Sequence, residues 1–387
     1  LLMLNEAAIA ELEKQQYRIV GSHSAVKVCG WTRNMIRGQG GCYKLKFYGI
    51  MSHQCMQMTT SMSCANRCTF CWRGYKAPVS KTWDWKVDDF KFIYDNSLVA
   101  HHKLLIGFKG SNKKVDKLYE QSQEVKHVAL SLTGEPIIYP EISKLIKKFH
   151  KNGVSTFLVT NSQYPKEIEE LEEITQLYLS IDTPNKEILK EVDKPLFADY
   201  YERMLASLDA LAKKKLRTAI RITQIKNVND VEPENYAKLI ERGCADFIEV
   251  KGYMHVGASQ ERLSRKNMPI HEEVVKFSKD IVGFLPGYEI VSEHIPSRVI
   301  LLAKKEWKID GEWKTWIDFK KFDSLVNSDE DFGRWDYYVK TPQVGLSGKG
   351  TIDGMSESSK KRYLNENPEC LVFVDENTSE VDLYKDE

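Results

Sequence analysis

Cysteine dominates the chemistry available to this chain. Six of its eight cysteines fall between positions 29 and 71 of a 387-residue sequence. The segment SCANRCTFCWRG spaces Cys64, Cys68 and Cys71, the loop cysteines, as C-x3-C-x2-C after an apolar run. Three thiolates on one short loop can hold three irons of a 4Fe–4S cube and leave the fourth iron without a protein ligand. In a reducing compartment such crowding favours metal binding over disulfides.

A cube with one open iron has a specific chemical use. S-adenosylmethionine (SAM) can chelate that iron through its amino and carboxylate groups, and one electron into the sulfonium releases a 5′-deoxyadenosyl radical. Two other interpretations stay open, namely core thiols that cluster by chance and a zinc site completed by a residue such as His53. Because C-x3-C-x2-C is poor zinc spacing, we predict a 4Fe–4S cluster on this loop.

Three further cysteines, Cys29, Cys42 and Cys55, precede the loop and are called the ladder cysteines. They are spaced by thirteen residues each, which is too wide for one loop but suits three chain segments around a second metal centre. Three thiolates again leave one iron open, here for a substrate. Unrelated thiols or a labile zinc site explain the same spacing equally well, so the residues alone leave a second cluster undecided.

The elements that must position these cysteines alternate between short apolar runs and helical patterns from about residue 55. The predicted strands are Cys55–Met62, His127–Leu132, Ser155–Asn161, Gln176–Asp182, Arg217–Ile225 and Asp246–Tyr253. The predicted helices include Tyr139–Lys151, Pro165–Ile174, Phe197–Lys215, Pro233–Arg242 and Ile270–Ile281. Six such units imply a parallel sheet with right-handed crossovers, and six rather than eight predict an α/β fold, a partial (β/α)6 TIM-like barrel.

Polar residues follow successive strands of this predicted sheet. They are Thr133, Gly134 and Glu135 after the second strand, Asn161 at the end of the third, and Ser180 and Asp182 at the end of the fourth. Ligands collect at the carboxyl ends of such strands, where Glu135 can accept a hydrogen bond from the SAM amino group and Gly134 permits close backbone approach. Each residue alone is more often a turn or cap residue, but their recurrence at successive strand ends predicts a cofactor pocket.

The two ends of the chain have a different pattern. We expect residues 1–54 to form an N-terminal extension that carries the ladder cysteines, residues 55–285 the barrel, and residues 286–387 a C-terminal β-hairpin and helical extension. The first twenty residues read as an amphipathic helix, with acidic residues where a signal peptide is basic. In ILLAKKEWKIDGEWKTWIDF two strand-like runs flank Asp310-Gly311, a hairpin signal. From about Ser347 the polar tail is predicted to be loosely ordered.

The charge pattern is compatible with several partners. The net charge is +1, and no run of about 18 uncharged apolar residues is present, so we expect a cytoplasmic protein that does not enter a membrane. The basic residues gather in three clusters: Lys103, Lys109, Lys113, Lys114 and Lys117; Lys213, Lys214, Lys215 and Arg217; and Arg262, Arg265 and Lys266. Each cluster is more often a solvated face than a nucleic-acid site, so a polyanionic partner is permitted but not required.

The C-x3-C-x2-C loop, the Gly-Glu-Pro after the second strand and the six βα units resemble the radical SAM superfamily. The ladder cysteines are similar to those of the tRNA 4-demethylwyosine synthases in their stand-alone, archaeal-type form, since no flavodoxin-like segment is present. The likeness runs from about residue 20 to residue 340. It implies a carbon–carbon lyase that acts on N1-methylguanosine-37 of tRNA-Phe. The deoxyadenosyl radical would take hydrogen from the N1-methyl group, and the carbon radical would attack pyruvate, which loses its carboxylate and supplies two carbons of 4-demethylwyosine.

The same resemblance implies roles for named residues. The loop cysteines would hold the radical-generating cluster, the ladder cysteines an auxiliary 4Fe–4S cluster, and SAM would occupy the strand-end pocket. Lys44, two residues after Cys42, would meet pyruvate either as a Schiff base or by positioning pyruvate on the open auxiliary iron. An external electron donor such as flavodoxin or ferredoxin and a monomeric enzyme are also expected. The stretch AIRITQIKNVND lacks the glycine of a common adenine motif, so adenine contacts stay unassigned.

A base in a folded anticodon loop must be splayed out before it can be modified, which predicts a basic, aromatic rim around the barrel mouth. Trp72, Arg73, Tyr75, Lys76 and Trp83 are candidates, although packing over the cluster is an equal alternative. Two other functions stay open. A glycyl-radical activase would need neither the lysine nor a basic mouth, and a zinc-containing RNA-binding module would use the cysteines structurally.

Overall fold

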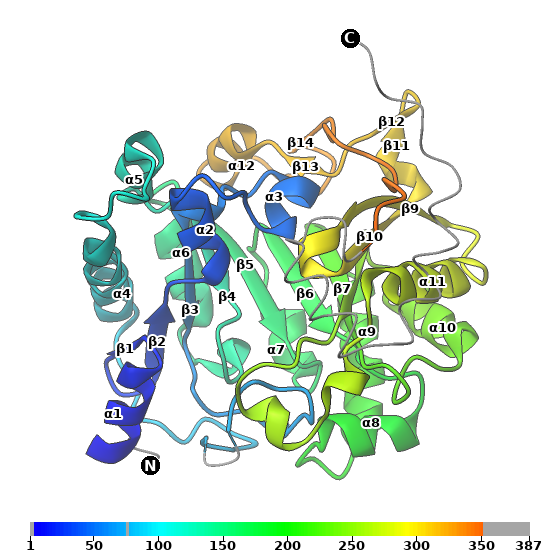
Figure 1. The fold of residues 1–387 in the computed structure, drawn as a ribbon, viewed down its shortest axis with the longest axis horizontal. Helices are drawn as coiled ribbons and strands as arrows, with labels where there is room; N and C mark the ends of the chain where they lie inside the picture. The colour runs from blue at the N-terminus through cyan, green and yellow to red at the C-terminus, as the bar shows by residue number, and fades with distance from the viewer. Residues whose placement is uncertain (1–3, 75–76, 351–387) are drawn as a thin grey trace.

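The computed structural model describes residues 4–74 and 77–350, which are built around a ten-stranded sheet in the order β1-β2-β3-β4-β5-β6-β7-β8-β10-β9 (Figure 1). The strands of this sheet are β1 (Tyr17–Val20), β2 (Ser24–Lys27), β3 (Cys55–Thr59), β4 (His127–Leu130), β5 (Ser155–Thr160), β6 (Gln176–Ser180), β7 (Arg217–Gln224), β8 (Phe247–Gly252), β9 (Tyr288–His294) and β10 (Val299–Lys304). The helices are α1 (Glu6–Lys14), α2 (Gly30–Ile36), α3 (Tyr43–Tyr48), α4 (Phe90–Leu105), α5 (Asp116–Ser122), α6 (Ile142–His150), α7 (Pro165–Glu170), α8 (Lys186–Asp193), α9 (Tyr200–Ala212), α10 (Pro233–Gly243), α11 (His271–Val282) and α12 (Phe319–Val326).

Strands β3 to β8 are parallel neighbours in chain order, and each begins within one residue of its predicted start. They end one to three residues earlier than predicted, because the polar residues at their carboxyl ends turn into loops. On its other side β3 pairs with antiparallel β2, and β8 pairs with antiparallel β10. The six strands therefore form an open row, which confirms the predicted partial barrel.

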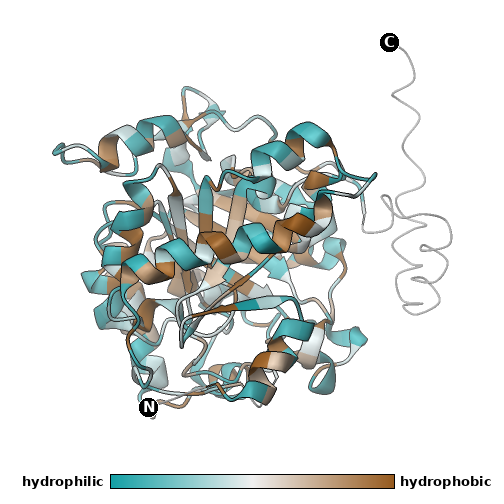
Figure 2. Ribbon diagram, turned by 90° about the vertical axis from the view of Figure 1, so that its left-hand side faces the viewer, coloured by the Kyte–Doolittle hydropathy of each residue, from teal (hydrophilic) through white to brown (hydrophobic). Residues whose placement is uncertain are grey.

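Alternate strand residues fill two cores, because successive side chains of a strand point to opposite faces. Leu158 and Ile248 point outward and belong to the cluster that the surrounding helices cover. Phe157, Tyr178 and Phe247 point inward and form a second buried cluster inside the barrel. Figure 2 shows brown, hydrophobic residues along the strands behind helices whose outward faces are largely teal. The aromatic cluster fills the amino-terminal half of the barrel and leaves the carboxyl ends for a site.

The N-terminal helix is shorter than predicted. It ends at Lys14, and Gln16 has a φ of 68°, a left-handed conformation that turns the chain. Tyr17–Val20 then forms β1, which pairs antiparallel with β2 and extends the sheet past β3. The prediction of one helix over the first twenty residues is therefore wrong at its end, because the apolar residues of YRIV serve a strand.

The predicted C-terminal hairpin is also shorter than expected. Lys308–Ile309 (β11) and Glu312–Trp313 (β12) pair around Asp310-Gly311, whose φ values of 52° and 79° suit a tight hairpin turn. The preceding apolar run is instead β10, which lies antiparallel between β8 and β9. Its residues 299–303 are all buried, so it is a central strand and not a hairpin arm. Most of the predicted loose tail, residues 351–387, lies outside the described residues.

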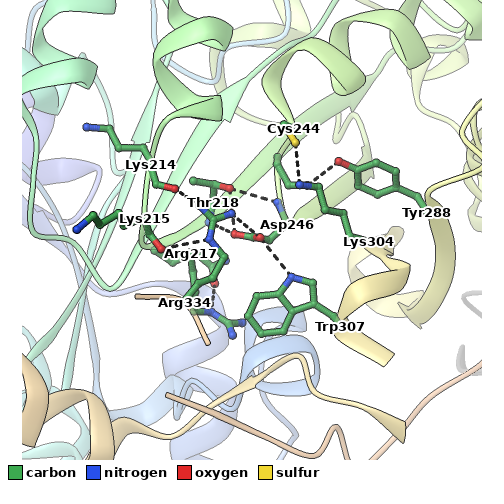
Figure 3. Close-up of polar contacts among 12 residues, drawn as sticks. Lys214, Lys215, Arg217, Thr218, Cys244, Asp246, Tyr288, Lys304, Trp307 and Arg334 are labelled. Carbon is green, nitrogen blue, oxygen red and sulfur yellow. Dashed lines mark hydrogen bonds and ion pairs between the residues drawn. The ribbon is translucent and has the colours of Figure 1, made fainter. Parts of the chain in front are cut away.

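The C-terminal extension is anchored at the end of the barrel remote from the strand carboxyl ends. It also contains the two-stranded pair β13 (Trp316–Ile317) and β14 (Tyr338–Val339). In Figure 3 Arg334 reaches the Asp246 carboxylate, at 2.7 Å, and the backbone carbonyls of Lys214 and Lys215. Trp307 Nε1 donates to the same carboxylate at 3.3 Å. The second basic cluster thus borders a structural contact of the C-terminal segment.

The sheet continues across both expected domain boundaries, because β2 pairs with β3 and β10 pairs with β8. A division at residues 54 and 285 stays a prediction. None of the helices in residues 4–74 and 77–350 is long and apolar enough to cross a lipid bilayer.

Candidate active site

A cavity of about 590 Å³ lies at the carboxyl ends of the parallel strands. Its wall includes every residue that the sequence predicted for the site: the six loop and ladder cysteines, Lys44, Thr133, Gly134, Glu135, Asn161, Ser180 and Asp182. The strands, the cluster loop and the N-terminal segment therefore converge on one space. Their convergence is what the predicted chemistry requires, while the role of each residue stays a prediction.

The loop that carries the loop cysteines is irregular and is fixed through its backbone. The Arg67 N–H donates to the Asp193 carbonyl at 3.0 Å, and the Thr69 N–H donates to the Val192 carbonyl at 2.7 Å. Both acceptors belong to the end of α8, which follows the fourth barrel strand. One side of the cluster loop is thus tied to the barrel.

Arg262, from the segment after β8, holds the other side of this loop. Its guanidinium donates to the backbone carbonyls of Thr69 at 2.9 Å, of Arg73 at 3.2 Å, and of Cys71. The Ala258 N–H adds a bond to the carbonyl of residue 72 at 3.0 Å. The expectation that Arg262 belongs to a solvated basic face is wrong, because its charge is used on carbonyl groups. No sequence signal marked this role, since backbone acceptors leave no residue-type pattern.

The loop thiols lie in surroundings that disfavour the free thiolate. Burial raises the pKa of Cys64 to about 11, and the nearby Arg73 partly opposes this rise. Burial, followed by the carboxylate of Asp193, raises the pKa of Cys68 well above its ordinary range. A bound metal replaces the thiol proton and supplies the positive charge that such a site lacks, so these thiols suit metal binding better than nucleophilic chemistry.

The ladder cysteines come together from three separate elements. Cys29 and Cys42 are the N-cap residues of α2 and α3, and Cys55 is the first residue of β3. Burial, Cys42 and Cys29 together raise the pKa of Cys55, which reflects how close the three thiols lie. In residues 4–74 and 77–350 no three His, Cys, Asp or Glu side chains converge tightly enough for a single metal ion. The fit of either cysteine set to a cluster therefore rests on donor type, spacing and the shared cavity.

Lys44 lies in α3, directly beside the ladder cysteines. Its Nζ is 4.1 Å from the centre of the ring of Tyr178, a member of the buried aromatic cluster inside the barrel. Burial lowers the pKa of Lys44 and Arg221 adds to the effect, whereas Glu249 opposes it. A lysine amine with a lowered pKa is available as a nucleophile. Arg221 and Glu249 were not predicted, because in the sequence each looks like an ordinary charged residue inside a strand.

The strand-end residues fit a ligand that carries an ammonium group. Gly134 has a φ of 67°, and a Cβ on it would lie 1.9 Å from the Ser61 carbonyl oxygen, so only glycine fits against the chain that leads into the cluster loop. Glu135 Oε2 accepts from the Asn161 N–H at 2.9 Å, while its buried Oε1 has no hydrogen-bond partner in the described residues. Burial raises the pKa of Glu135 to about 8. The Thr133 hydroxyl is also buried, with no hydrogen-bond partner in residues 4–74 and 77–350.

The remaining predicted pocket residues differ in how many of their polar groups are already hydrogen-bonded within the protein. Asn161 Nδ2 lies 3.4 Å from Cys64 Sγ, which couples the pocket to the cluster loop. Asp182 Oδ1 accepts from the Thr223 N–H at 2.6 Å, and burial raises the pKa of Asp182 to about 6. The Ser180 carbonyl accepts from the Ser162 hydroxyl at 2.9 Å. Asp182 is thus partly committed to the fold.

The predicted rim residues separate into different roles. Trp72 lines the cavity, and its ring stacks on Tyr17 at 6.0 Å. Arg73 donates at 3.0 Å to the carbonyls of Met62 and Pro78, so it braces the loop from within. Trp83 packs on His23, away from the cavity. Residues 75 and 76 lie outside the described residues.

Family comparisons point in the same direction as this geometry. Residues 58–240 match the family described as "Radical SAM superfamily", and residues 242–304 match "Wyosine base formation". The second match contains the segment from which Arg262 holds the cluster loop. The chain is 46% identical over 353 residues to the Mus musculus protein named S-adenosyl-L-methionine-dependent tRNA 4-demethylwyosine synthase TYW1, which covers 89% of this chain and 49% of that protein.

The Arabidopsis thaliana S-adenosyl-L-methionine-dependent tRNA 4-demethylwyosine synthase is 44% identical over 367 residues, covering 94% of this chain and 56% of its own length. The chain thus spans about half the length of the curated relatives it matches. A solved structure described as "Structure of TYW1 with a lysine-pyruvate adduct bound" has a TM-score of 0.71 and 37% identity, covering 79% of this chain and 98% of its own. Because that solved relative is matched over almost its whole length, this chain belongs to the tRNA 4-demethylwyosine synthase (TYW1) family of the radical SAM superfamily.

Proposed function

We propose that this chain converts N1-methylguanosine-37 of tRNA-Phe and pyruvate into 4-demethylwyosine. Membership of the radical SAM superfamily implies SAM and one 4Fe–4S cluster, and a second cluster on the ladder cysteines is part of the proposal. The observation that carries it is the single cavity, whose wall holds both cysteine sets and Lys44. A radical made at one end can then meet a pyruvate-derived group at the other without leaving the barrel.

The residues present fit the cofactors. The loop cysteines would bind the SAM cluster, which supplies, when reduced, the electron that cleaves SAM to a 5′-deoxyadenosyl radical. Glu135 would pair its free Oε1 with the SAM ammonium, an interaction that favours the carboxylate over the protonated acid. Gly134 keeps the backbone of this pocket in contact with the chain that precedes the cluster loop.

Lys44 would hold pyruvate as a Schiff base. Its position beside the ladder cysteines and its lowered pKa support this role, as does the lysine–pyruvate adduct named for a solved relative. The ladder cysteines would hold a second cluster with one iron that has no protein ligand. The alternative in which pyruvate chelates that iron while Lys44 only positions it predicts no covalent adduct.

The tRNA would present its modified base after the nucleotide is splayed from the anticodon loop into the cavity mouth. Trp72, and Trp31 from α2, are aromatic residues on the cavity wall that are available for stacking. We further propose that a flavodoxin- or ferredoxin-class protein donates the electron and that the chain acts as a monomer in the cytoplasm.

The test is anaerobic reconstitution with iron and sulfide, followed by incubation with SAM, N1-methylguanosine tRNA and carbon-labelled pyruvate. We expect two pyruvate carbons in each modified base, with incorporation lost in Cys42→Ala. Cys244→Ala is the matched control, because Cys244 is an exposed cysteine that does not line the cavity. If SAM is cleaved while no label enters the tRNA, the proposed function is wrong and an activase becomes the better interpretation.

A further inference from the structure

The ladder end of the cavity contains two cationic side chains that the proposed function does not use. Arg221 lies on β7 and Lys251 on β8, and both line the cavity. The strands are in register so that Arg221 is opposite Glu249 and Thr223 is opposite Lys251. Since Glu249 and Lys251 are two residues apart, they point to the same inner face of the barrel. Arg221, Glu249 and Lys251 therefore form one patch.

Arg221 has hydrogen-bonding capacity that the fold leaves unused. Its Nε is buried and has no partner within the part of the chain that the structure describes. Arg217, four residues earlier on the same strand, provides the contrast. Its Nε donates to Gln176 Oε1 at 3.1 Å and one terminal nitrogen donates to the Thr315 carbonyl at 2.5 Å. The other terminal nitrogen of Arg217 is also buried without a partner among the described residues, but Arg217 does not line the cavity, whereas Arg221 does.

Lys251 is also only weakly engaged. Its Nζ donates to the Ser297 carbonyl at 3.3 Å, near the outer limit of a hydrogen bond. Burial, Arg221 and Arg298 together lower the pKa of Lys251 to about 7, while Glu249 opposes them. Two neighbouring cations that lower each other's pKa destabilise each other's charged form, and an anion placed between them stabilises both. Glu249 is fully buried, and neither of its oxygens has a hydrogen-bond partner among the described residues; its charge raises the pKa of Lys44, Arg221 and Lys251.

The geometry points to Arg221 and Lys251 as the receptor for the carboxylate of the 2-oxo acid whose carbonyl carbon meets Lys44. This inference rests on the proposed function and adds the group that selects the substrate. A guanidinium can bind a carboxylate with two parallel hydrogen bonds, which fixes the plane of the acid as well as its charge. Neutral ketones and aldehydes offer the same carbonyl to Lys44 but nothing to this pair, so the pair determines specificity.

The covalent step balances without a further reagent. The Lys44 Nζ–C2 bond forms, the C2 oxygen leaves as water with two protons from the amine, and no electron is transferred. The carboxylate keeps its charge throughout and stays on Arg221 and Lys251. The acid is thereby held with its C1–C2 bond in a fixed direction before any radical reaches it.

The test uses the reconstituted full chain without SAM, treated with cyanoborohydride and increasing pyruvate. The modified fraction of the Lys44 peptide is measured by mass spectrometry. We expect Arg221→Gln to raise the half-saturating pyruvate concentration about 30-fold, since a charge-assisted hydrogen bond is lost, and Lys251→Met to raise it less. Trapping with acetone, which has no carboxylate, should change little in either variant and also reports that the Lys44 site is intact.

A second variant guards against misfolding. Arg221→Gln removes one of the three cations beside Glu249, whereas the double variant Arg221→Gln/Glu249→Gln keeps the local charge balanced and should lose pyruvate preference to the same extent. An unchanged pyruvate dependence in both variants overturns the inference. So does a loss confined to tRNA binding, which would assign the pair to an RNA phosphate. If the wild-type protein traps no pyruvate on Lys44, the Schiff-base function itself fails, which is a distinct result.

Discussion

The loop cysteines lie on one short irregular segment, whereas the ladder cysteines come from the starts of two helices and a strand. The loop depends on distant parts of the chain for its shape, through α8 on one side and Arg262 on the other. The ladder depends on the N-terminal segment packing correctly on β3. The difference teaches that close spacing in sequence does not make a site self-sufficient, since the local set is the one held by residues from almost two hundred positions away.

The chemistry beside each set differs as well. The loop end holds the carboxyl groups of Glu135 and Asp193 beside the Arg73 guanidinium, whereas Lys44, Arg221 and Lys251 gather around the Glu249 carboxylate at the ladder end. In the proposed function the free Glu135 oxygen would accept from the SAM ammonium, and the cations of the ladder end would bind a carboxylic acid.

The largest expected effect is a separation of the two activities. In Cys68→Ala both SAM cleavage and label incorporation should fall more than about a hundredfold, because a proposed cluster ligand is removed. In Cys42→Ala reductive SAM cleavage should stay largely intact while incorporation is lost. Product analysis by liquid chromatography measures both. An equal loss of SAM cleavage in the two variants would break the distinction between the sets.

The contact of Arg262 with the backbone of the cluster loop provides the next test. Arg262→Ala should lower SAM cleavage about 10- to 100-fold, because three backbone carbonyls of the cluster loop lose their donor. Arg262→Lys should restore part of the rate, and Lys266→Ala, an exposed change in the same basic cluster, should have little effect. The electron paramagnetic resonance signal of the reduced loop cluster should broaden in Arg262→Ala only. A normal rate of SAM cleavage in Arg262→Ala would show that these hydrogen bonds are dispensable.

A third prediction concerns the contact between Gly134 and the Ser61 backbone, which leads into the cluster loop. Gly134→Ala should destabilise the protein by about 2–4 kcal/mol, because the new Cβ would collide with the Ser61 backbone and the residue needs a left-handed φ. Gly287→Ala, where a Cβ meets nothing within 4 Å, should change stability by less than about 0.5 kcal/mol. Urea unfolding of both variants measures the difference. Equal stabilities would mean that the loop can move away from this strand end.

The smallest expected effect is a pH dependence at the loop end. Between the ordinary pKa of 4.5 and its raised value of about 8, Glu135 holds more proton in the folded than in the unfolded chain. Folding stability from this group is therefore present at low pH and is lost as pH rises through that window. Glu135→Gln should flatten the pH dependence and melt a few degrees higher than wild type near pH 8 without SAM. Addition of SAM should stabilise only the wild type. If SAM also stabilises Glu135→Gln, Glu135 does not bind SAM.

Much of this site was predictable because its residues carry strong local signals. The strand starts and twelve of the predicted residues on the cavity wall follow from apolar runs, cysteine spacing and polar residues at strand ends, whereas Lys44 follows from the family resemblance alone. Arg262, Arg221 and Lys251 were not predictable. Arg262 bonds to carbonyl groups, which any residue offers, and the other two are inward-facing charges that resemble outward-facing ones until the strand register is known.

The ends of the fold were predicted less well for the same reason. The apolar run at residues 299–303 fits a hairpin arm or a central strand equally, and only its tertiary position between β8 and β9 decides. In the same way YRIV continues a helical pattern, yet it pairs with β2 because the sheet edge accepts it.

The central claim, that one cavity holds two clusters with different tasks, is tested most directly by Mössbauer and electron paramagnetic resonance spectroscopy of two complementary variants. One replaces all three loop cysteines with alanine and the other replaces all three ladder cysteines. We predict four irons per chain in each variant, and a reduced-cluster signal that SAM perturbs only where the loop cysteines remain. A single variant that loses all iron, or a SAM-sensitive signal in the variant without loop cysteines, would contradict the account.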